Sequence, residues 1–472
     1  MNTHSNASEP INCPYLVIGG GISGLTTAYH LSRMGKTVTV LEATSRVGGA
    51  VGSIEEDGWL RELGPNSLVQ TPEMAALMSA LDLGSEIIEA NTVAKKRFVA
   101  KNGHPVALPG NPLELLTSPL FSMSDLWHLA REAWIKPVNK EETIAEFVQR
   151  RLGQGFLDWA VDPFVSGVYA GDPNRLSVQA AIPKIYAFEQ ESGSLIRGGI
   201  AKMKAAKANP TPITLPAKGK LFSFKRGLQT LTDALATAIT SSGRGNIQLD
   251  SAITHIQRLP EGGWSVKTAQ GKTFHTRQLI LSTPAHVSAQ LLGEVDGPLA
   301  ETLAAIEYPP VTSVVMGFDR SQVAHPLDGF GLLLPSKEKK RTLGVLFSST
   351  LFPNRTPAGK VLLSSFIGGR KDPEAAQGDE QELLDRVLGD LSPLLGIKGK
   401  PEFLRVKRWQ QAIPQYEIGY LELQEKITHR LNALPGLSLN GNWRGGIAVG
   451  DCLNNGNKLA ERLIENTRTE EA

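Results

Sequence analysis

Apolar residues near the start of the chain form two short continuous runs with a helical repeat between them. Residues 15–18 and 37–41 are apolar or β-branched, which is typical of buried parallel strands. Residues 22–34 repeat their apolar positions with a helical period, and Gly35 stands where a helix commonly ends. The pattern therefore predicts a β-α-β unit within the first 65 residues.

The rest of the chain changes pattern several times. Helical periods predict a helical middle region, and residues 198–220 are typical of an exposed connection. Strand-like runs follow, of which the later ones predict an antiparallel sheet, and the last seventy residues return to strand, glycine-rich loop and terminal helix. The helical periods cover 114–135, 141–161 and 381–388, and the strand-like runs are 252–256, 264–268, 278–282, 313–318, 331–334, 342–348 and 361–367.

Composition narrows the class of protein. A chain of 472 residues predicts two or three lobes. With 49 Lys and Arg against 47 Asp and Glu, the net charge is +2, so we expect no nucleic-acid partner. Cys13 and Cys452 match no zinc spacing, and we expect no metal. The polar start shows no secretory or organelle signal, and no run of about eighteen apolar residues predicts a transmembrane helix.

A glycine-rich turn joins the first predicted strand to the first predicted helix. Gly19, Gly21 and Gly24 form G-x-G-x-x-G. The first glycine allows a tight turn, the second lets the backbone approach a pyrophosphate, and the third lets helix and strand pack closely. Ile22 and Ser23 open the helix, whose N–H groups and dipole favour phosphate. The turn predicts a dinucleotide site.

The residues after the second predicted strand favour FAD over NAD. Glu42 follows Gly24 by eighteen residues, where a carboxylate would accept hydrogen bonds from a ribose. Arg46 and the pair Gly48-Gly49 follow, adding a cation and flexible backbone beside the same pyrophosphate. A surface turn with a solvated Glu42 is the alternative, and the β-α-β context disfavours it.

Motifs spread along the chain resemble the flavin amine oxidase superfamily and, within it, the protoporphyrinogen oxidases. The resemblance begins with GGGISGL and EATSRVGG and extends from about residue 15 to about residue 465 in chain order. It is carried further by the stretches 63–67 (LGPNS), 165–173 (VSGVYAGDP), 329–336 (GFGLLLPS), 342–349 (TLGVLFSS) and 441–450 (GNWRGGIAVG).

The resemblance implies an α/β and α+β protein built from three parts. The first is a Rossmann-type FAD-binding domain, assembled from 12–85, 222–295 and 405–466. The second is a substrate-binding domain with an antiparallel sheet and helices, assembled from 86–100, 190–221 and 296–404. The third is a small helical membrane-associating domain over 101–189.

The resemblance also assigns residues to a noncovalent FAD. Some amine oxidases attach FAD to cysteine, but Cys452 within the closing motif is more typical of a small packed residue. The assigned residues are Gly19, Gly21, Ile22, Ser23, Gly24, Glu42, Ala43, Arg46, Gly48, Gly49, Gly64, Pro65, Asn66, Ser67, Trp409, Gly441, Gly446, Ile447 and Val449.

The substrate implied by the resemblance is protoporphyrinogen IX, an apolar macrocycle with two propionates. Arg97 matches an arginine that pairs with a propionate, although a basic surface cluster with Lys95 and Lys96 is the alternative from sequence alone. The resemblance assigns apolar contacts with the macrocycle to Leu333, Leu346 and Phe366, although these could equally be core residues of a sheet. It also implies that the backbone at Ala170 and Gly171 approaches the macrocycle closely.

The implied chemistry is hydride transfer from a meso carbon to flavin N5. Three rounds would remove six electrons, and three O2 would reoxidise the flavin to give H2O2, in porphyrin and heme biosynthesis. None of the nine His falls in a matched motif, so we name no general base and expect catalysis by positioning.

Residues 112–137 mix Leu, Phe, Met and Trp with Lys and Arg, as an interfacial segment would, although an amphipathic core helix is the alternative. With the resemblance, we expect a cytoplasmic protein attached peripherally to the inner, cytoplasmic membrane. The resemblance also allows a homodimer and hand-over of the product to a chelatase.

Three rival functions stay open. Coproporphyrinogen III oxidation on the same fold would require more cations near Arg97, because that substrate carries four carboxylates. An amine oxidase would show an aromatic cage. A non-catalytic escort protein of this architecture would lack flavin-binding residues such as Glu42 and Arg46, which are present here.

Overall fold

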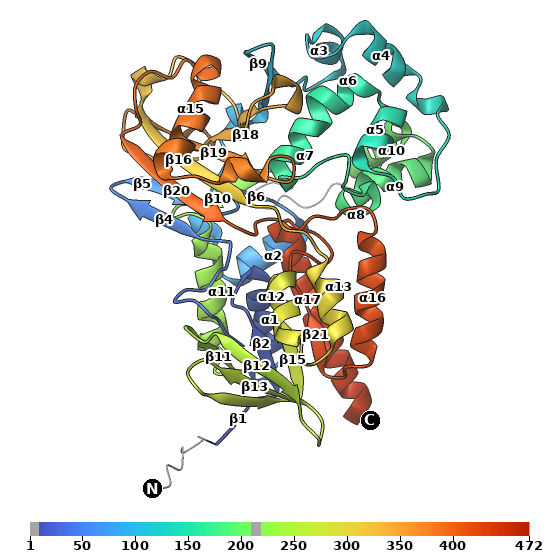
Figure 1. Cartoon of the computed structure of the whole chain (residues 1–472), viewed down its shortest axis with the longest axis vertical. Coiled ribbons are helices and arrows are strands. Elements are labelled where there is room, and N and C mark those ends of the chain that lie inside the picture. The colour runs from blue at the N-terminus through green and yellow to red at the C-terminus, as the bar shows by residue number, and fades with distance from the viewer. Residues whose placement is uncertain (1–8, 209–218, 472) are drawn as a thin grey trace.

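The computed structural model describes residues 9–208 and 219–471. The first eight residues of the predicted polar start, and residues 209–218 of the predicted connection, lie outside this range. The chain forms two lobes, one around a parallel sheet and one around a larger mixed sheet with helices beside it (Figure 1).

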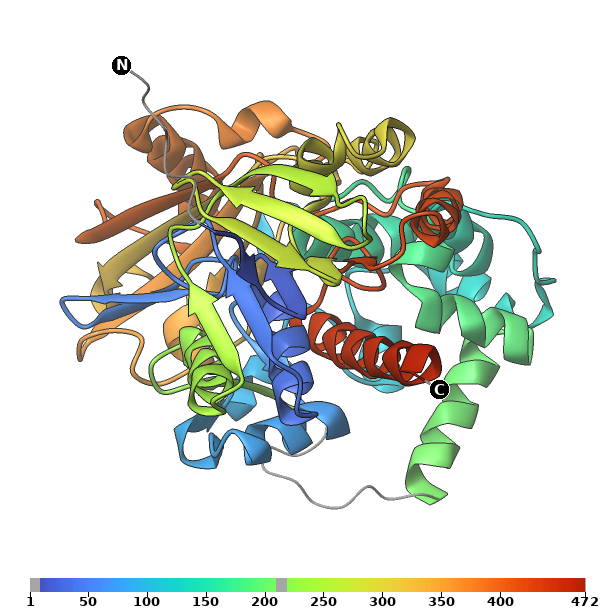
Figure 2. The ribbon, with the colours of Figure 1, turned by 90° about the horizontal axis from the view of Figure 1, so that it is seen from below.

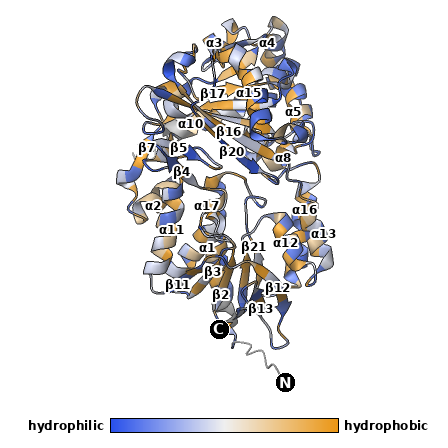
Figure 3. Cartoon of the chain, turned by 60° about the vertical axis from the view of Figure 1, so that its left-hand side comes forward, coloured by the Kyte–Doolittle hydropathy of each residue, from blue (hydrophilic) through white to orange (hydrophobic). Residues whose placement is uncertain are grey.

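A five-stranded parallel sheet forms the first lobe, in the order β11-β3-β2-β15-β21. Its strands are β2 (Tyr15–Ile18), β3 (Val38–Leu41), β11 (Gly245–Gln248), β15 (Gln278–Leu281) and β21 (Leu437–Leu439). Both faces of the sheet are covered, one by helices and the other by the strands around Trp264 and Phe274 together with helices. The central strands β2 and β3 are therefore buried throughout, and they are coloured mainly as hydrophobic in Figure 3. The predicted β-α-β unit is confirmed.

The helices of this lobe pack on both sides of the sheet. The first helix, α1 (Ile22–Arg33), packs along the last, α17 (Val449–Glu471), and along α11 (Gln229–Ser241) (Figure 2). The others are α2 (Pro72–Ala80), α12 (Ala285–Leu292), α13 (Gly297–Ala304) and α16 (Tyr420–Asn432).

Three smaller sheets accompany the two main sheets. The four-stranded sheet has the order β1-β14-β13-β12, the three-stranded sheet the order β6-β10-β7, and β4 pairs with β5. Their strands are β1 (Ile11–Asn12), β4 (Ser53–Glu56), β5 (Trp59–Glu62), β6 (Leu68–Val69), β7 (Ile87–Glu89), β10 (Leu221–Phe224), β12 (Ile253–Arg258), β13 (Trp264–Thr268) and β14 (Thr273–Thr276).

A seven-stranded sheet forms the centre of the second lobe, in the order β20-β16-β19-β18-β17-β8-β9. The predicted antiparallel sheet is confirmed with one correction, because β17 pairs with β8 in parallel. Since β8 comes from a segment far from β17 in the sequence, no hairpin connects the two strands and fixes their relative direction. The strands are β8 (Phe98–Lys101), β9 (His104–Ala107), β16 (Val311–Asp319), β17 (Gly331–Leu333), β18 (Thr342–Phe347), β19 (Lys360–Gly368) and β20 (Phe403–Trp409).

The two faces of this sheet have different neighbours. One face packs on α15 (Glu380–Leu395). On the other face, Val315, Leu362 and Phe403 enclose Trp59 of β5. The second face therefore lies against a strand that leads directly into the predicted flavin stretch 63–67.

The predicted helical middle is broken into short helices. Asn111 caps a helix that begins just before the predicted span 114–135, and Ser122 caps a second helix within it, so the predicted helical region is confirmed as more than one helix. A helix also occupies 195–208 of the predicted connection, because Ala, Lys and Met are strong helix formers. The helices are α3 (Pro112–Thr117), α4 (Met123–Ala130), α5 (Ile144–Arg151), α6 (Gln154–Phe156), α7 (Asp162–Tyr169), α8 (Val178–Ala181), α9 (Pro183–Ser192), α10 (Leu195–Ala208) and α14 (Ser348–Leu351).

Single-turn helices link these elements. They are η1 (Gly84–Glu86), η2 (Thr92–Lys95), η3 (Glu132–Trp134), the π-helical turn η4 (Leu157–Val161), η5 (Arg320–Gln322), η6 (Ser336–Glu338) and η7 (Pro373–Ala376). Over 9–208 and 219–471, no helix is long and apolar enough to cross a bilayer.

Candidate functional site

The glycine turn between β2 and α1 lies at the carboxyl end of the parallel sheet. Gly19 has a φ of 102°, and a side chain there would meet the Ser282 carbonyl oxygen at 2.9 Å. A side chain on Gly24 would lie 2.0 Å from the Gly19 carbonyl oxygen. Both positions therefore exclude a side chain for reasons internal to the fold.

Gly21 is different, because none of the described residues fills the space beside it. It caps α1 with a φ of −71°, which any residue can adopt, and an added Cβ would meet no atom within 4 Å. No side chain caps the helix, so the N–H groups of Ile22, Ser23 and Gly24 have no capping side-chain partner. Open space and helix N–H groups together fit a pyrophosphate.

Glu42 directly follows β3 and is fixed beside this turn. Its carboxylate accepts hydrogen bonds from the Gly20 amide at 2.7 Å and from the amide and hydroxyl of Thr44 at 2.9 and 2.7 Å. The side chain is buried. Ala43 follows it, so the predicted ribose acceptor lies at the edge of the turn, held in place by three bonds.

Arg46 shapes the loop that brings the glycine pair to the turn. Its guanidinium donates to the carbonyls of Val47, Val51 and Gly49 and to the amide oxygen of Gln229. The Gly48 amide donates to the Gly20 carbonyl at 2.8 Å, and Gly21 and Gly48 form a parallel bridge. We predicted a cation for the pyrophosphate here; the contacts within the chain give Arg46 a loop-shaping role.

The stretch 63–67 packs against the same glycine loop. The Leu63 amide donates to the Gly52 carbonyl at 2.8 Å, and a side chain on Gly64 would lie 2.3 Å from the Ala50 carbonyl oxygen. The indole of Trp409, from β20, donates to the Leu63 carbonyl at 3.0 Å. Pro65, Asn66 and Ser67 follow, all partly exposed. The structure thus brings together predicted cofactor residues that are far apart in sequence.

The closing loop 441–449 joins β21 to α17. Tyr416 fixes it, since its hydroxyl donates to the Asn442 carbonyl at 2.6 Å and accepts from the Gly446 amide at 3.0 Å. Burial raises the pKa of Tyr416 well above its usual value, so the hydroxyl stays protonated. Ile447 packs toward the helical cluster, and Val449 begins α17. Sequence reasoning missed Tyr416, which belongs to no motif.

Cys452 lies on α17 and is 2% exposed. Burial raises the pKa of its thiol to about 11, so the nucleophilic thiolate is disfavoured.

The predicted substrate residues share one face of the seven-stranded sheet. Leu333 lies opposite Gly344, which in turn lies opposite Phe366. Leu346 lies two residues beyond Gly344 and therefore points to the same face. All three apolar side chains are partly exposed within otherwise buried stretches of strand. The residue between Leu333 and Phe366 is Gly344, and the Leu333 side chain lies 3.1 Å from where a Cβ of that residue would be.

Arg97 and the 170–171 backbone lie at the borders of this face. Arg97 directly precedes β8, beside β17, and its guanidinium lies over the ring of Phe330 at 5.3 Å. Ala170 ends α7 with a φ of 48°, and its carbonyl accepts from the Arg370 amide at 2.7 Å, just beyond β19. Gly171 packs on the Gln415 side chain.

The contrast between two glycines gives a direct test of the cofactor site. Because an alanine methyl group meets open space at position 21, Gly21→Ala should keep the melting temperature while FAD affinity falls by about tenfold or more. Gly24→Ala should lower stability itself. Thermal unfolding and FAD titration of the apoprotein separate the two effects.

Gly199→Ala, which also adds a methyl group in open space, serves as the matched control and should bind FAD normally. Wild-type FAD affinity in Gly21→Ala would contradict the assignment of this space to the cofactor.

Comparison with known proteins agrees with this geometry. The family model for flavin containing amine oxidoreductase matches residues 22–464. Protoporphyrinogen oxidase 2, chloroplastic/mitochondrial, of Arabidopsis thaliana is 35% identical, over 95% of this chain and 93% of that protein. Coproporphyrinogen III oxidase of Bacillus subtilis (strain 168) is 27% identical, over 93% and 96%. A crystal structure from Exiguobacterium sp. 255-15 superposes with a TM-score of 0.80 at 24% identity, covering 97% of this chain and 99% of that one.

The family match spans nearly the whole chain, and the glycine turn, Glu42 and the open space at Gly21 all fit a bound dinucleotide. The chain therefore belongs to the flavin containing amine oxidoreductase family and is an FAD-dependent oxidase.

Proposed function

We propose that this enzyme oxidises protoporphyrinogen IX to protoporphyrin IX in porphyrin biosynthesis, with O2 as acceptor and H2O2 as the second product. The observation that carries the proposal is the apolar sheet face bordered by one cation without a carboxylate partner. The 35% identity to a protoporphyrinogen oxidase supports it.

The sheet face suits a flat, apolar ligand with few polar groups. Leu333, Leu346 and Phe366 are partly exposed among buried neighbours, so a bound macrocycle would complete their burial. Arg97 borders this face, and its planar guanidinium matches a propionate bidentately. The Ala170 carbonyl accepts a hydrogen bond from the Arg370 amide, just beyond the end of β19, so the Ala170 backbone lies along another border of the face.

The charges near Arg97 favour the substrate with two propionates over coproporphyrinogen, which carries four carboxylates. Lys96 pairs with Asp328 at 2.5 Å, and Lys101 donates to the carbonyls of Pro119 and Leu120. Arg97, by contrast, has no carboxylate partner in the described part of the chain. Lys95 also has no ion-pair partner among the described residues, but Arg97 is the residue adjacent to β8 and is therefore the cation at the edge of the apolar face.

When bound by the residues assigned above, FAD would supply the redox chemistry, which is hydride acceptance from a meso carbon and electron transfer to O2. The side chains named above bind and orient the macrocycle and exclude water, and we assign no side chain as general base. We propose that FAD is held noncovalently, by the residues assigned above, because the Cys452 thiol is buried. We also propose the three-part domain division given by the resemblance.

Steady-state assays of the holoenzyme with both porphyrinogens test this function. We expect protoporphyrinogen to be oxidised with the higher kcat/KM and with H2O2 release. A clear preference for coproporphyrinogen would overturn the substrate assignment, and turnover of amines alone would overturn the reaction.

The role of Arg97 is tested by Arg97→Ala. Because a bidentate charge-assisted contact is lost, KM for the porphyrinogen should rise by about tenfold, while FAD content stays at the wild-type level. Lys95→Ala, at the exposed end of η2, is the matched control and should leave KM unchanged. If KM is unchanged in Arg97→Ala, the propionate role is wrong.

We further propose that the enzyme rests on the cytoplasmic membrane through an apolar surface formed by α3, α4 and η3 at the end of the second lobe, where α3 and α4 lie at the top of Figure 1. We call it the α3–η3 patch. Arg131 stacks on one of its indoles at 4.4 Å, which places a cation among apolar groups, as at a lipid headgroup boundary. The patch consists of Leu113, Leu116, Met123, Trp127 and Trp134, which are 62–79% exposed.

The resemblance alone suggests two more properties: a homodimer, and delivery of the product to a chelatase.

Membrane binding is tested by the double variant Trp127→Ser and Trp134→Ser. Since two large apolar side chains leave the patch, binding to anionic vesicles should fall by about tenfold or more, with the oxidase rate on detergent-dispersed substrate unchanged. Leu249→Ser, at an exposed apolar residue of the first lobe, is the control. Equal vesicle binding by the double variant and the wild type would exclude the patch.

A further inference from the structure

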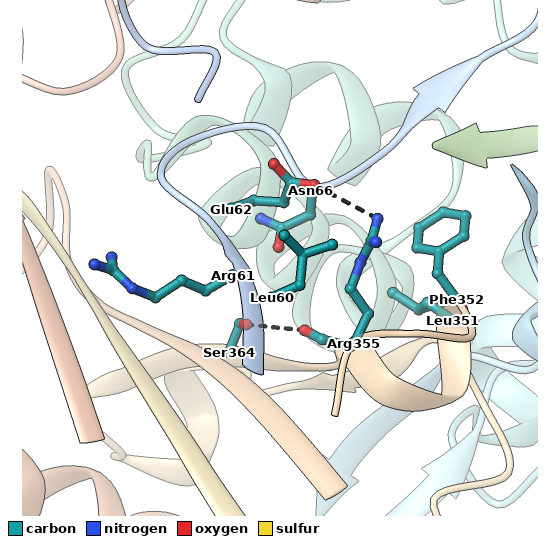
Figure 4. A pocket seen from close by; sticks show the side chains of 9 residues that line it. Leu60, Arg61, Glu62, Asn66, Leu351, Phe352, Arg355 and Ser364 are labelled. Atoms are coloured by element: carbon teal, nitrogen blue, oxygen red, sulfur yellow. Dashed lines mark hydrogen bonds and ion pairs between the residues drawn. The ribbon is translucent and has the colours of Figure 1, made fainter. Parts of the chain in front are cut away.

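A small cavity separates the 63–67 stretch from the face of the seven-stranded sheet. Glu62 and Arg355 approach each other beside it, and Asn66, Ser348 and Ser364 also line it (Figure 4). The free volume of the cavity is about 10 Å³, measured as the space that the centre of a water molecule can reach. The lining side chains therefore almost fill it. Two charged side chains are therefore packed where the two lobes meet.

Arg355 reaches this position from the loop after α14 and is 3% exposed. Its guanidinium lies 3.6 Å from the Glu62 carboxylate and donates to the Ser223 hydroxyl at 2.8 Å and, at 3.4 Å, to the Phe224 carbonyl. The Leu60 amide donates to the Arg355 carbonyl at 3.0 Å. One residue thus contacts both β5 and β10.

These contacts fix both ends of the 63–67 stretch. Glu62 is the last residue of β5, immediately before the stretch. Directly after it, β6 pairs with β10, with Phe222 opposite Leu68. Because Arg355 bonds to Ser223 and Phe224 on β10, it holds the far end through that strand. The stretch can move little without breaking a contact to Arg355.

Arg355 also belongs to the substrate side of the molecule. The helix before it, α14, directly follows β18, which carries Leu346. The Ser348 hydroxyl of α14 bonds to the Ser364 hydroxyl at 2.8 Å, and Ser364 lies two residues before Phe366 on the same sheet face. Arg355 therefore follows the segment that carries the predicted substrate residues.

Glu62 connects Arg355 to the first lobe through its own hydrogen bonds. It accepts from the Ser53 hydroxyl at 2.5 Å and from the Leu228 amide, at the start of α11, at 3.1 Å. The other charged side chains that line the cavity are Arg355 and Arg61; Arg61 precedes Glu62 on β5, points away from it in Figure 4, and pairs with Glu56 at 3.5 Å.

We propose that Glu62 and Arg355 form a positioning pair that fixes the 63–67 stretch against the sheet face carrying Leu346 and Phe366, and thereby sets the spacing between flavin and substrate. This inference rests on the proposed function, because that function places the flavin beside 63–67 and the porphyrinogen on the sheet.

The cost of burying two charges supports a positioning role. Apolar side chains of the same volume would often stabilise a protein as well as a buried ion pair does. Stability alone therefore does not require charges here, whereas directional bonds from one guanidinium to two strands do fix geometry. Burial also raises the pKa of Glu62 to about 7, so its charge changes within an accessible pH range.

The test compares Glu62→Gln, Arg355→Lys, Arg355→Met and the double variant Glu62→Gln with Arg355→Met, all as FAD-loaded full-length enzymes. We expect each single variant to lower kcat by about tenfold to a hundredfold, because small misplacements cost that much, while KM changes little. The flavin visible spectrum and reduction potential should shift.

Two comparisons separate positioning from loss of fold. The double variant should recover part of the kcat lost in Arg355→Met, because it leaves no unpaired buried carboxylate. The wild-type kcat should fall as the pH drops through about 7, where Glu62 gains a proton, and this inflection should be absent in Glu62→Gln.

Glu132→Gln is the matched control, because Glu132 is also fully buried and pairs with Arg151 at 3.0 Å, far from 63–67 in the fold. It should lower stability but leave the flavin spectrum and potential unchanged.

Fully loaded Glu62→Gln and Arg355→Lys enzymes with wild-type kcat, spectrum and potential would overturn the proposal. If Arg355→Met does not fold, these two variants still decide the question. Wild-type enzyme without porphyrinogen oxidation would instead refute the proposed function, while the spectrum and potential of the variants would still report on the pair.

Discussion

The close packing of the Gly19 carbonyl against Gly24 is the constraint on which the site depends. A side chain at Gly24 would lie 2.0 Å from that oxygen, so α1 can begin directly beside β2 only with glycine there. This contact directs the N-terminus of α1 to the carboxyl end of the parallel sheet. Glu42 then bonds to this turn through its carboxylate, and the glycine pair and the 63–67 stretch pack around it by short backbone contacts.

The elements that were predicted correctly are those whose structure is determined by residues close together in the sequence. The β-α-β unit at the start is encoded by adjacent residues: an apolar run, a glycine turn and a helical repeat. The strands at 264–268 and 342–347 also have their own β-branched and apolar patterns. The division of 114–135 into short helices was missed, because capping by Asn111 and Ser122 competes with a continuous apolar period.

Contacts between distant segments explain what the sequence did not predict. Tyr416 fixes the closing loop from outside any motif, and Arg355 meets Glu62 across almost 300 positions of sequence. No periodicity in either segment specifies its partner. The family resemblance supplied Leu333, Leu346 and Phe366, and the strand register supplies the physical reason why they form one surface.

We propose that FAD in this enzyme accepts electrons from a porphyrinogen bound on that sheet face. Anaerobic mixing of the holoenzyme with protoporphyrinogen IX tests this most directly, with the flavin visible absorption as the signal. We expect the flavin band to bleach and then to return, with H2O2 formation, when O2 is admitted. A flavin that stays oxidised with the porphyrinogen, but is reduced by an amine, would contradict it.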